Sequence, residues 1–211
     1  KMKQILLHYK EQIKQTLSND EIFHIFEHNK NIVHFLLKNE IITISDHIYK
    51  SMMSKFESNG VYYWHFFIPE LGEKISKEKM SFVKKELLKK NPTLFENYEK
   101  KKKREDGENE SYICSLIRQD LVEEFISHVN RYNISLLSSI SPSIFETNQF
   151  LNEHNEISLI EYLAFFGAFQ IFQYLVMNKV ELTSSLWLYV IHSKNPELIH
   201  LLESYKVKPP H

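Results

Sequence analysis

The stretch SLIEYLAFFGAFQIFQYLVMNKVEL, residues 158–182, decides how the fold of this chain is interpreted. Its first part is largely apolar and ends at Gly167. Its second part has two apolar residues, one polar residue and then three largely apolar residues: Ile171-Phe172, Gln173 and Tyr174-Leu175-Val176. This spacing is typical of two short helices joined by a turn, each with one apolar face. A helix of about nine residues is not stable alone, so the pair must bury its apolar face against a neighbour.

The pattern of the second helix occurs again elsewhere in the chain. NIVHFLLKNEIIT (31–43) and PELIHLLESYKV (196–207) repeat it closely, and LVEEFISHVN (121–130) repeats it weakly. When the copies are aligned on their first apolar residue, they start at positions 32, 122, 171 and 198. Repeats of a helix–turn–helix unit that cannot fold alone predict an α-solenoid, in which the units stack side by side.

The composition independently indicates an all-α protein. The chain has 211 residues, of which 43% are hydrophobic and 25% are charged, with only 4 glycines and 6 prolines. Glycine-containing turns between alternating strands are almost absent, which argues against a sheet. The net charge of −1 gives no general attraction to nucleic acid or to an anionic membrane. No apolar run reaches the roughly 20 residues of a membrane span. The single cysteine, Cys114, excludes an internal disulfide and favours a cytoplasmic location.

The sequence predicts two parts separated by a charged segment. Residues 1–104 form a helical N-terminal region with one repeat-like unit at 21–39, and this region is either a separate helical cap or a continuation of the same stack. Residues 105–110, EDGENE, form a charged hinge around Gly107. Residues 111–211 hold stacked helix–turn–helix units with shortened loops. Because the periodicity runs almost to the last residue, we expect these units to continue in a longer protein.

The stretch at 158–182 resembles an ankyrin repeat. Ser158 stands where that family's opening threonine lies, Ala164 matches its small first-helix residue, and Gly167 matches the glycine between its helices. In the next unit, residues 197–199 (Glu-Leu-Ile) match the family's Glu-Val-Val. The resemblance implies an ankyrin-like solenoid that binds other proteins.

The departures from the ankyrin pattern concern its turns. The Pro-Leu-His of the opening motif is missing, and Lys179 and Lys194 replace glycines. The copies at 171 and 198 are 27 residues apart, where the family has about 33. More closely, the run 111–203 resembles a divergent ankyrin-like domain of unknown function, which occurs in very large numbers in parasitic flagellated protists. That resemblance points to flagellated cells and therefore implies a link to the cytoskeleton or the cilium.

One short motif suggests metal chemistry. HIFEH, residues 24–28, has the H-x-x-E-H spacing of the inverted zinc-protease signature. A working site also needs a third ligand and an open coordination position, and no second motif that supplies a ligand is recognisable. In the repeat frame, His24 falls in a slot that is apolar in the other copies, and His28 falls at the turn between the helices. We therefore favour a role in repeat packing and assign no metal or cofactor.

Three further stretches each allow two interpretations. The basic run EKKKKRE (99–105) is either a localisation or phosphate-binding patch or, as we favour, a solvated helix end. The aromatic run VYYWHFFIP (61–69) is either a binding hot spot or, as we favour, a buried helix or connector. The lysine-rich stretch 73–90 forms an amphipathic helix, for which a solvated lysine face is favoured over a membrane-surface role.

The sequence therefore favours a non-catalytic protein-interaction scaffold. Its partners are expected to be other proteins, with no nucleic acid, membrane or small-molecule substrate. We expect contacts on solvent-facing residues of the first helices and of the turns: Glu161, Phe165, Phe166, Tyr189, His192 and Lys194. Two alternatives stay open, a stably incorporated component of a cytoskeletal or ciliary assembly and, more remotely, a zinc hydrolase.

Overall fold

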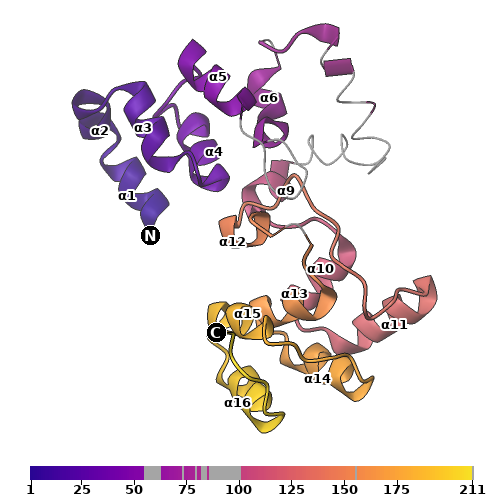
Figure 1. The fold of residues 1–211 in the computed structure, drawn as a ribbon. Helices are drawn as coiled ribbons and strands as arrows, with labels where there is room; N and C mark the ends of the chain where they lie inside the picture. The colour runs from indigo at the N-terminus through magenta and orange to yellow at the C-terminus, as the bar shows by residue number, and fades with distance from the viewer. Residues whose placement is uncertain are drawn as a thin grey trace. The chain divides into compact units, whose positions relative to one another are not determined.

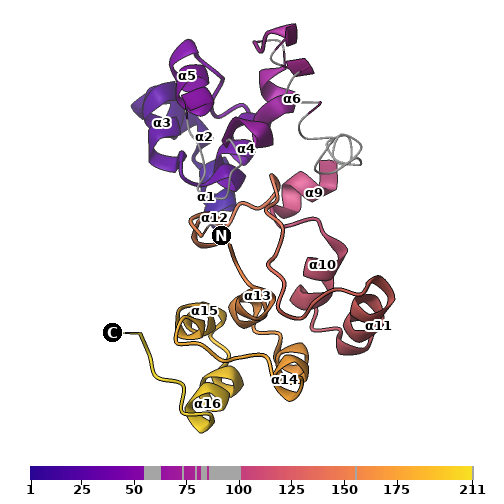
Figure 2. The same cartoon turned by 45° about the vertical axis from the view of Figure 1, so that its right-hand side comes forward.

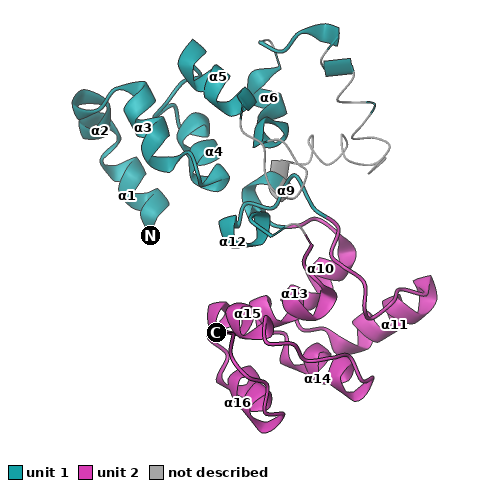
Figure 3. Ribbon diagram, viewed as in Figure 1, with its two compact units in different colours: residues 1–108, 142–155 teal, residues 109–141, 156–211 magenta. Residues whose placement is uncertain are grey.

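The protein is all-α, as the sequence predicts. The structure is a computed structural model that describes residues 1–54, 63–72, 74–78, 80, 81, 85, 101–154 and 156–210. Within these residues it contains 14 α-helices, one 3₁₀ helix and no strand (Figure 1). The chain divides into two compact units, residues 1–108 with 142–155 and residues 109–141 with 156–211 (Figure 3).

The first unit is a set of short helices around one apolar core. Its helices are α1 (Met2–His8), α2 (Lys10–Thr16), α3 (Asn19–Phe26), α4 (Lys30–Lys38), α5 (Asp46–Ser54), the 3₁₀ helix η1 (Tyr63–Phe67), α6 (Ile68–Leu71), α9 (Lys101–Asp106) and α12 (Gln149–Asn152). Helix α3 packs against α4 and α5, and η1 packs against α4, α5 and α6. Phe23, Leu36 and Phe67 are fully buried in this core. The segment 142–155 returns to it and adds the buried ring of Phe145.

Polar side chains cap the start of a helix in each of the two units. Ser18 opens α3 with a capping box, in which its backbone N–H donates to the Glu21 carboxylate at 2.8 Å and its hydroxyl accepts from the Glu21 N–H. Ser158 and Glu161 form the same box at the start of α13 (Leu159–Phe166), with a distance of 2.9 Å from the Ser158 nitrogen to the carboxylate. Such boxes satisfy N–H groups that a helix leaves unpaired at its start.

The aromatic run at 61–69 is part of the core of the first unit. Residues 63–67 form η1, and every side chain in it is buried, so the prediction of a buried connector is confirmed for the described residues. Residues 61 and 62 lie outside the described part of the chain, as does most of the basic helix expected at 73–90. Within that stretch, Ile75 is buried in the core.

The segment 105–110, expected to be a hinge, contains two buried residues. Gly107 is buried with φ at 68°, and its carbonyl accepts from the Thr147 N–H at 3.0 Å and from the Thr147 hydroxyl at 2.7 Å. Asn109 is 4% exposed, and its amide nitrogen donates to the Ser141 carbonyl at 2.9 Å. The boundary between the two compact units falls between residues 108 and 109.

The second unit consists of three helix–turn–helix pairs. They are α10 (Tyr112–Arg118) with α11 (Val122–Tyr132), α13 with α14 (Phe169–Met177), and α15 (Leu186–Ser193) with α16 (Pro196–Ser204). The first helices contact one another in the order α10, α13, α15, and the second helix α11 contacts α14. Figure 2 shows the first helices in one row and the second helices in another. The core of this unit therefore lies between the two helices of each pair and between neighbouring pairs.

Each pair turns through one residue with a left-handed backbone. These residues are Asp120 (φ 51°), Gly167 (φ 73°) and Lys194 (φ 56°). Lys179, which follows α14, has φ at 63°. Lys179 and Lys194 are the positions where the ankyrin pattern has glycine, and a left-handed residue other than glycine costs about 1 kcal/mol or more.

Side chains join the turns of neighbouring pairs. The Asp120 carboxylate accepts from the Gln170 N–H at 2.9 Å and from the Ile171 N–H at 3.0 Å, so it caps α14 from the preceding pair. The Asn195 side-chain amide donates to the Gly167 carbonyl at 3.0 Å. Helix α14 has no cap from its own N-cap residue, and the neighbouring pair supplies one.

The structure shifts the register expected for the HIFEH motif. Ser18 and Ser158 both cap a first helix, so Phe23, and not His24, takes the place that Leu163 has in α13. Phe23 and Leu163 are both fully buried. The turn after α3 is one residue longer than the turn after α13, and no glycine in the sequence marks that difference.

The weak copy at 121–130 is shifted by two residues. With Asp120 and Gly167 at equivalent turns, Phe125 takes the place of Phe172, and both rings are fully buried. The apolar spacing of the sequence matches position 122 with position 171, but the left-handed turns at Asp120 and Gly167 set the observed register.

Candidate interaction surfaces

The surface expected on the first helices is only partly present. The Phe165 ring on α13 and the His192 ring on α15 lie 5.3 Å apart, with Phe165 half-buried and His192 exposed. Phe166 is half-buried, and the Arg118 guanidinium lies 5.9 Å from the centre of its ring. Lys194 is exposed at the turn after α15. The structure thus pairs Phe165 with His192 and places Phe166 against α10.

Two of the six predicted surface residues have structural roles. The Glu161 carboxylate closes the capping box of α13 and also accepts from the Ser185 hydroxyl at 2.8 Å. Tyr189 is 3% exposed, so the expectation that it faces solvent is wrong. Burial, together with the nearby Glu161 charge, raises the pKa of Tyr189 to about 12. Tyr189 takes the place that the buried Tyr162 has in α13, and the contact of α13 with α15 covers that face.

HIFEH places two histidine side chains beside one carboxylate on the surface of the first unit. The Glu27 carboxylate lies 3.2 Å from His24 Nδ1 and 3.5 Å from His28 Nε2, and the two histidine side chains are 56% and 72% exposed. The expected role of these histidines in repeat packing is therefore wrong, since Ile22 and Phe23 carry the packing of α3. Among the residues that the structure describes, no group of three or more His, Cys, Asp or Glu side chains is arranged to hold a metal ion.

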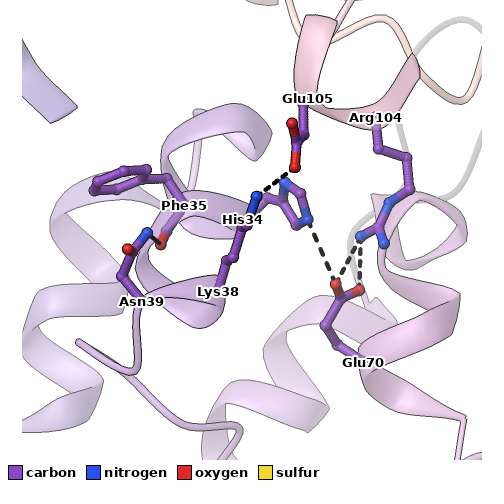
Figure 4. Close-up of polar contacts among 7 residues, drawn as sticks. All are labelled: His34, Phe35, Lys38, Asn39, Glu70, Arg104 and Glu105. Atoms are coloured by element: carbon purple, nitrogen blue, oxygen red, sulfur yellow. Dashed lines mark hydrogen bonds and ion pairs between the residues drawn. The ribbon is translucent and has the colours of Figure 1, made fainter. Parts of the chain in front are cut away.

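A network of charged side chains joins three helices of the first unit. One Arg104 nitrogen of α9 donates to both oxygens of Glu70 on α6, at 2.9 and 2.7 Å. His34 Nε2 on α4 lies 3.6 Å from the same carboxylate, and Lys38 of α4 pairs with Glu105 of α9 (Figure 4). Arg104 is buried, so the interpretation of this basic run as a solvated helix end is wrong at that position.

His34 is uncharged at neutral pH in this network. Burial, together with the Arg104 guanidinium, lowers the pKa of His34 to about 4, and the Glu70 carboxylate only partly offsets both effects. The Arg104 guanidinium also lies 5.2 Å from the centre of the Phe66 ring. Opposite charges are matched within the network, which favours a role in holding α9 to α4 and α6.

The second unit carries a groove with exposed aromatic side chains. The groove lies between α10 and α11, has a volume of about 580 Å³ and is lined by Tyr112, Glu123, Glu124, Ser127, His128, Arg131 and Tyr132. The His128 ring lies between two tyrosine rings, 4.9 Å from Tyr112 and 4.8 Å from Tyr132. Tyr112 is 56% and Tyr132 is 59% exposed. We call these lining residues the tyrosine groove.

The tyrosine groove combines features of a protein-binding surface. Tyrosine offers a large apolar ring and a polar hydroxyl, and it is enriched at sites that dominate protein–protein affinity. The sequence gives part of the signal, since His128 and Tyr132 are spaced four apart on one helix face. The contribution of Tyr112 from the preceding helix requires the tertiary structure.

None of the described helices is long and apolar enough to cross a membrane. Comparison of the chain with protein-family models, with curated proteins and with solved structures found no match in any of the three.

Proposed function

We propose that this chain is a non-catalytic protein-interaction module built as an ankyrin-like solenoid. The observation that carries the proposal is the tyrosine groove, because two large aromatic side chains remain more than half exposed there while both belong to packed helices. Exposed aromatic rings that are clustered, and not scattered singly, mark a surface that a partner covers.

The arrangement of the second unit supports the solenoid. Its pairs repeat the same turn geometry at Asp120, Gly167 and Lys194, and its first helices contact one another in chain order. In such a stack each pair buries its apolar face against its neighbours, and the remaining surface is free to vary for binding.

The groove suits a protein partner better than a small molecule. It is open, with acidic, basic and aromatic side chains spread over two helices. A small-molecule site is usually an enclosed, mostly apolar cavity with few polar groups. A partner side chain that packs on Tyr112 or Tyr132 would gain affinity from the buried ring area, with polar contacts to Glu124 and Arg131 at the edge.

The proposal is tested by capture of the full chain with its partners from its native cells, followed by stepwise salt washes. The same capture is done with a Tyr112→Ala/Tyr132→Ala variant. We expect one or a few proteins to be retained by the wild-type chain and lost from the double variant. Tyr9→Ala serves as a matched control, because Tyr9 is 49% exposed in the other unit and should leave capture unchanged.

The capture experiment can also contradict a role for the tyrosine groove. If the wild-type chain and the double variant retain the same proteins in the same amounts, the tyrosine groove is not the binding surface. Circular dichroism of both proteins shows whether the substitutions leave the helices intact, which we expect because both side chains project from the surface.

A further inference from the structure

A second groove in the same unit is lined by lysines and apolar side chains. It lies where α14 and α16 end, has a volume of about 460 Å³ and is formed by Val176, Lys179, Val180, Leu182, Ser184, Tyr205, Lys206, Val207 and Lys208. We call it the lysine groove. It shares no residue with the tyrosine groove.

The walls of the lysine groove come from equivalent positions of two successive helix pairs. Lys179 and Lys206 are 27 residues apart, and so are Val180 and Val207. Both lysines have a left-handed backbone, with φ at 63° and 56°. The N–H groups of Val180 and Val207 donate to Leu175 and Leu202 carbonyls at 3.1 and 3.0 Å, so the two turns have the same geometry. The groove is thus built by the repeat itself.

The charge of the lysine groove is of one sign. Its charged lining residues are Lys179, Lys206 and Lys208, and none of the carboxylates in the described part of the chain lines it. Within the described residues, no ion pair joins any of these lysines to an acidic side chain. The carbonyl ends of helices attract lysines, which accounts for a lysine at either turn. That attraction does not account for Lys208, which lies beyond the last turn of α16.

The lining of the lysine groove is not only charged. The groove also has an apolar floor, formed by Val180 and the half-buried Val207. The Trp187 indole N–H donates to the Val207 carbonyl at 2.9 Å and holds that wall in place.

From this charge and shape we infer that the lysine groove binds an acidic peptide segment of a partner protein, with carboxylates on the lysines and an apolar side chain on the valine floor. A single-stranded nucleic acid fits less well, because among the described lining residues Tyr205 alone carries an aromatic ring, whereas such sites stack successive bases on aromatic rings. The proposal does not depend on the tyrosine groove.

The test uses the purified full chain and a fluorescein-labelled synthetic peptide rich in Glu and Asp with a central Leu-Leu pair. Fluorescence anisotropy should show binding that weakens as salt rises, since salt screens exposed charges. The same peptide with Lys in place of the acidic residues should not bind. A K179E/K206E/K208E variant should bind the acidic peptide about tenfold more weakly or worse.

Two variants separate binding from folding. K194E is the matched control, because Lys194 is an exposed lysine with φ at 56°, as Lys206 is, and lies outside the groove. It should bind the acidic peptide as the wild type does. K179G/K206G should melt at a higher temperature than the wild type, because glycine relieves the left-handed strain, and should bind the peptide more weakly.

Three results would overturn the inference. One is an acidic-peptide affinity that the triple variant leaves unchanged, and another is an equal loss in K194E. The third is binding of a single-stranded oligonucleotide or of phosphatidylserine vesicles without binding of the peptide, which would assign the groove to a different class of partner.

Discussion

The structure requires glycine at position 107, because it leaves no room for a side chain there. Its φ of 68° lies in the left-handed region, and a Cβ built there would come within 2.6 Å of both the Asn31 side-chain nitrogen and the Thr147 hydroxyl oxygen. Thr147 cannot easily give way, because its hydroxyl and its N–H both donate to the Gly107 carbonyl. The residue therefore ties the end of α9 to the segment that follows residue 142.

We expect Gly107→Ala to destabilise the first unit by about 2 kcal/mol, from left-handed strain and from the steric clash. Urea unfolding followed by circular dichroism measures the change. Gly72→Ala is the matched control, because a Cβ at Gly72 has no neighbour closer than 3.5 Å and its φ is not positive. Equal stability of the two variants would show that the Gly107 contacts are not formed in solution.

The neutral His34 makes the stability of the first unit dependent on pH. Its folded pKa of about 4 lies below the ordinary value of 6.5, so between these values the unfolded chain binds a proton that the folded chain does not. This contribution to stability is therefore fully present above about pH 6.5 and is lost as the pH falls towards 4.

We expect His34→Gln to reduce the stability lost between about pH 7 and pH 5 by about 1–2 kcal/mol, relative to the wild type. The measurement is urea unfolding of both proteins at the two pH values. His28→Gln should leave the loss as it is in the wild type, since His28 is 72% exposed. If His34→Gln loses as much stability between these two pH values as the wild type does, groups other than His34 cause the pH dependence.

At the scale of the element, the start of helix α14 is capped by a side chain from the preceding helix pair. Helix α14 starts after Ala168, which offers no side-chain acceptor, and Asp120 supplies two from the turn of the preceding pair. A carboxylate at this place also interacts favourably with the positive end of the helix dipole. The formation of α14 is thereby coupled to the position of the α10–α11 turn.

We expect Asp120→Ala to lower the free energy of unfolding by about 1–2 kcal/mol. Hydrogen exchange should show faster loss of protection at the Gln170 and Ile171 amides than elsewhere in the unit. Asp120→Asn, which keeps one acceptor and tolerates a left-handed backbone, should lose less than half as much stability. If exchange at those two amides is the same in wild type and Asp120→Ala, the cap is not formed.

The sequence predicts the helices well but misses which neighbours they meet. Ser18 and Ser158 are each followed by a glutamate three residues later, and this pattern indicates where two first helices begin. The apolar spacing that follows predicts the second helix of each pair. Local spacing also predicts that Tyr189 is exposed, whereas the contact between α13 and α15 buries it. The tyrosine groove and the charge network of Arg104 depend on side chains that are far apart in the chain.

At the scale of the whole chain, the first compact unit is not continuous in sequence. Residues 142–155 belong to it although α10 and α11 precede them, and Phe145 from this segment is fully buried in its core. The apolar residues at 144 and 145 follow a proline and a serine and show no helical period, so nothing in the local sequence indicates where they pack.

We therefore expect Phe145→Ala to destabilise the first unit by about 3–5 kcal/mol, through lost burial and the cavity that remains. Hydrogen exchange should rise in α3–α6 and much less in α13–α16. Leu137→Ala is the control, because Leu137 is 74% exposed, and it should change stability by less than about 0.5 kcal/mol. Higher exchange in α13–α16 than in α3–α6 would place Phe145 in the other unit.

The constant 27-residue offset between the last two helix pairs suits growth of the protein by duplication of a gene segment. Ser158 and Ser185, Gly167 and Lys194, and Lys179 and Lys206 all differ by that number. A duplication of the block that begins at Ser158 would carry its capping serine and both left-handed positions with it, so the new copy could stack without change to the old ones. The connection between two pairs can also be longer, since Asp120 and Gly167, at equivalent turns of the first two pairs, lie at positions that differ by 167 − 120 = 47. A stack can therefore lengthen by whole blocks, while single substitutions alter the exposed positions within each block.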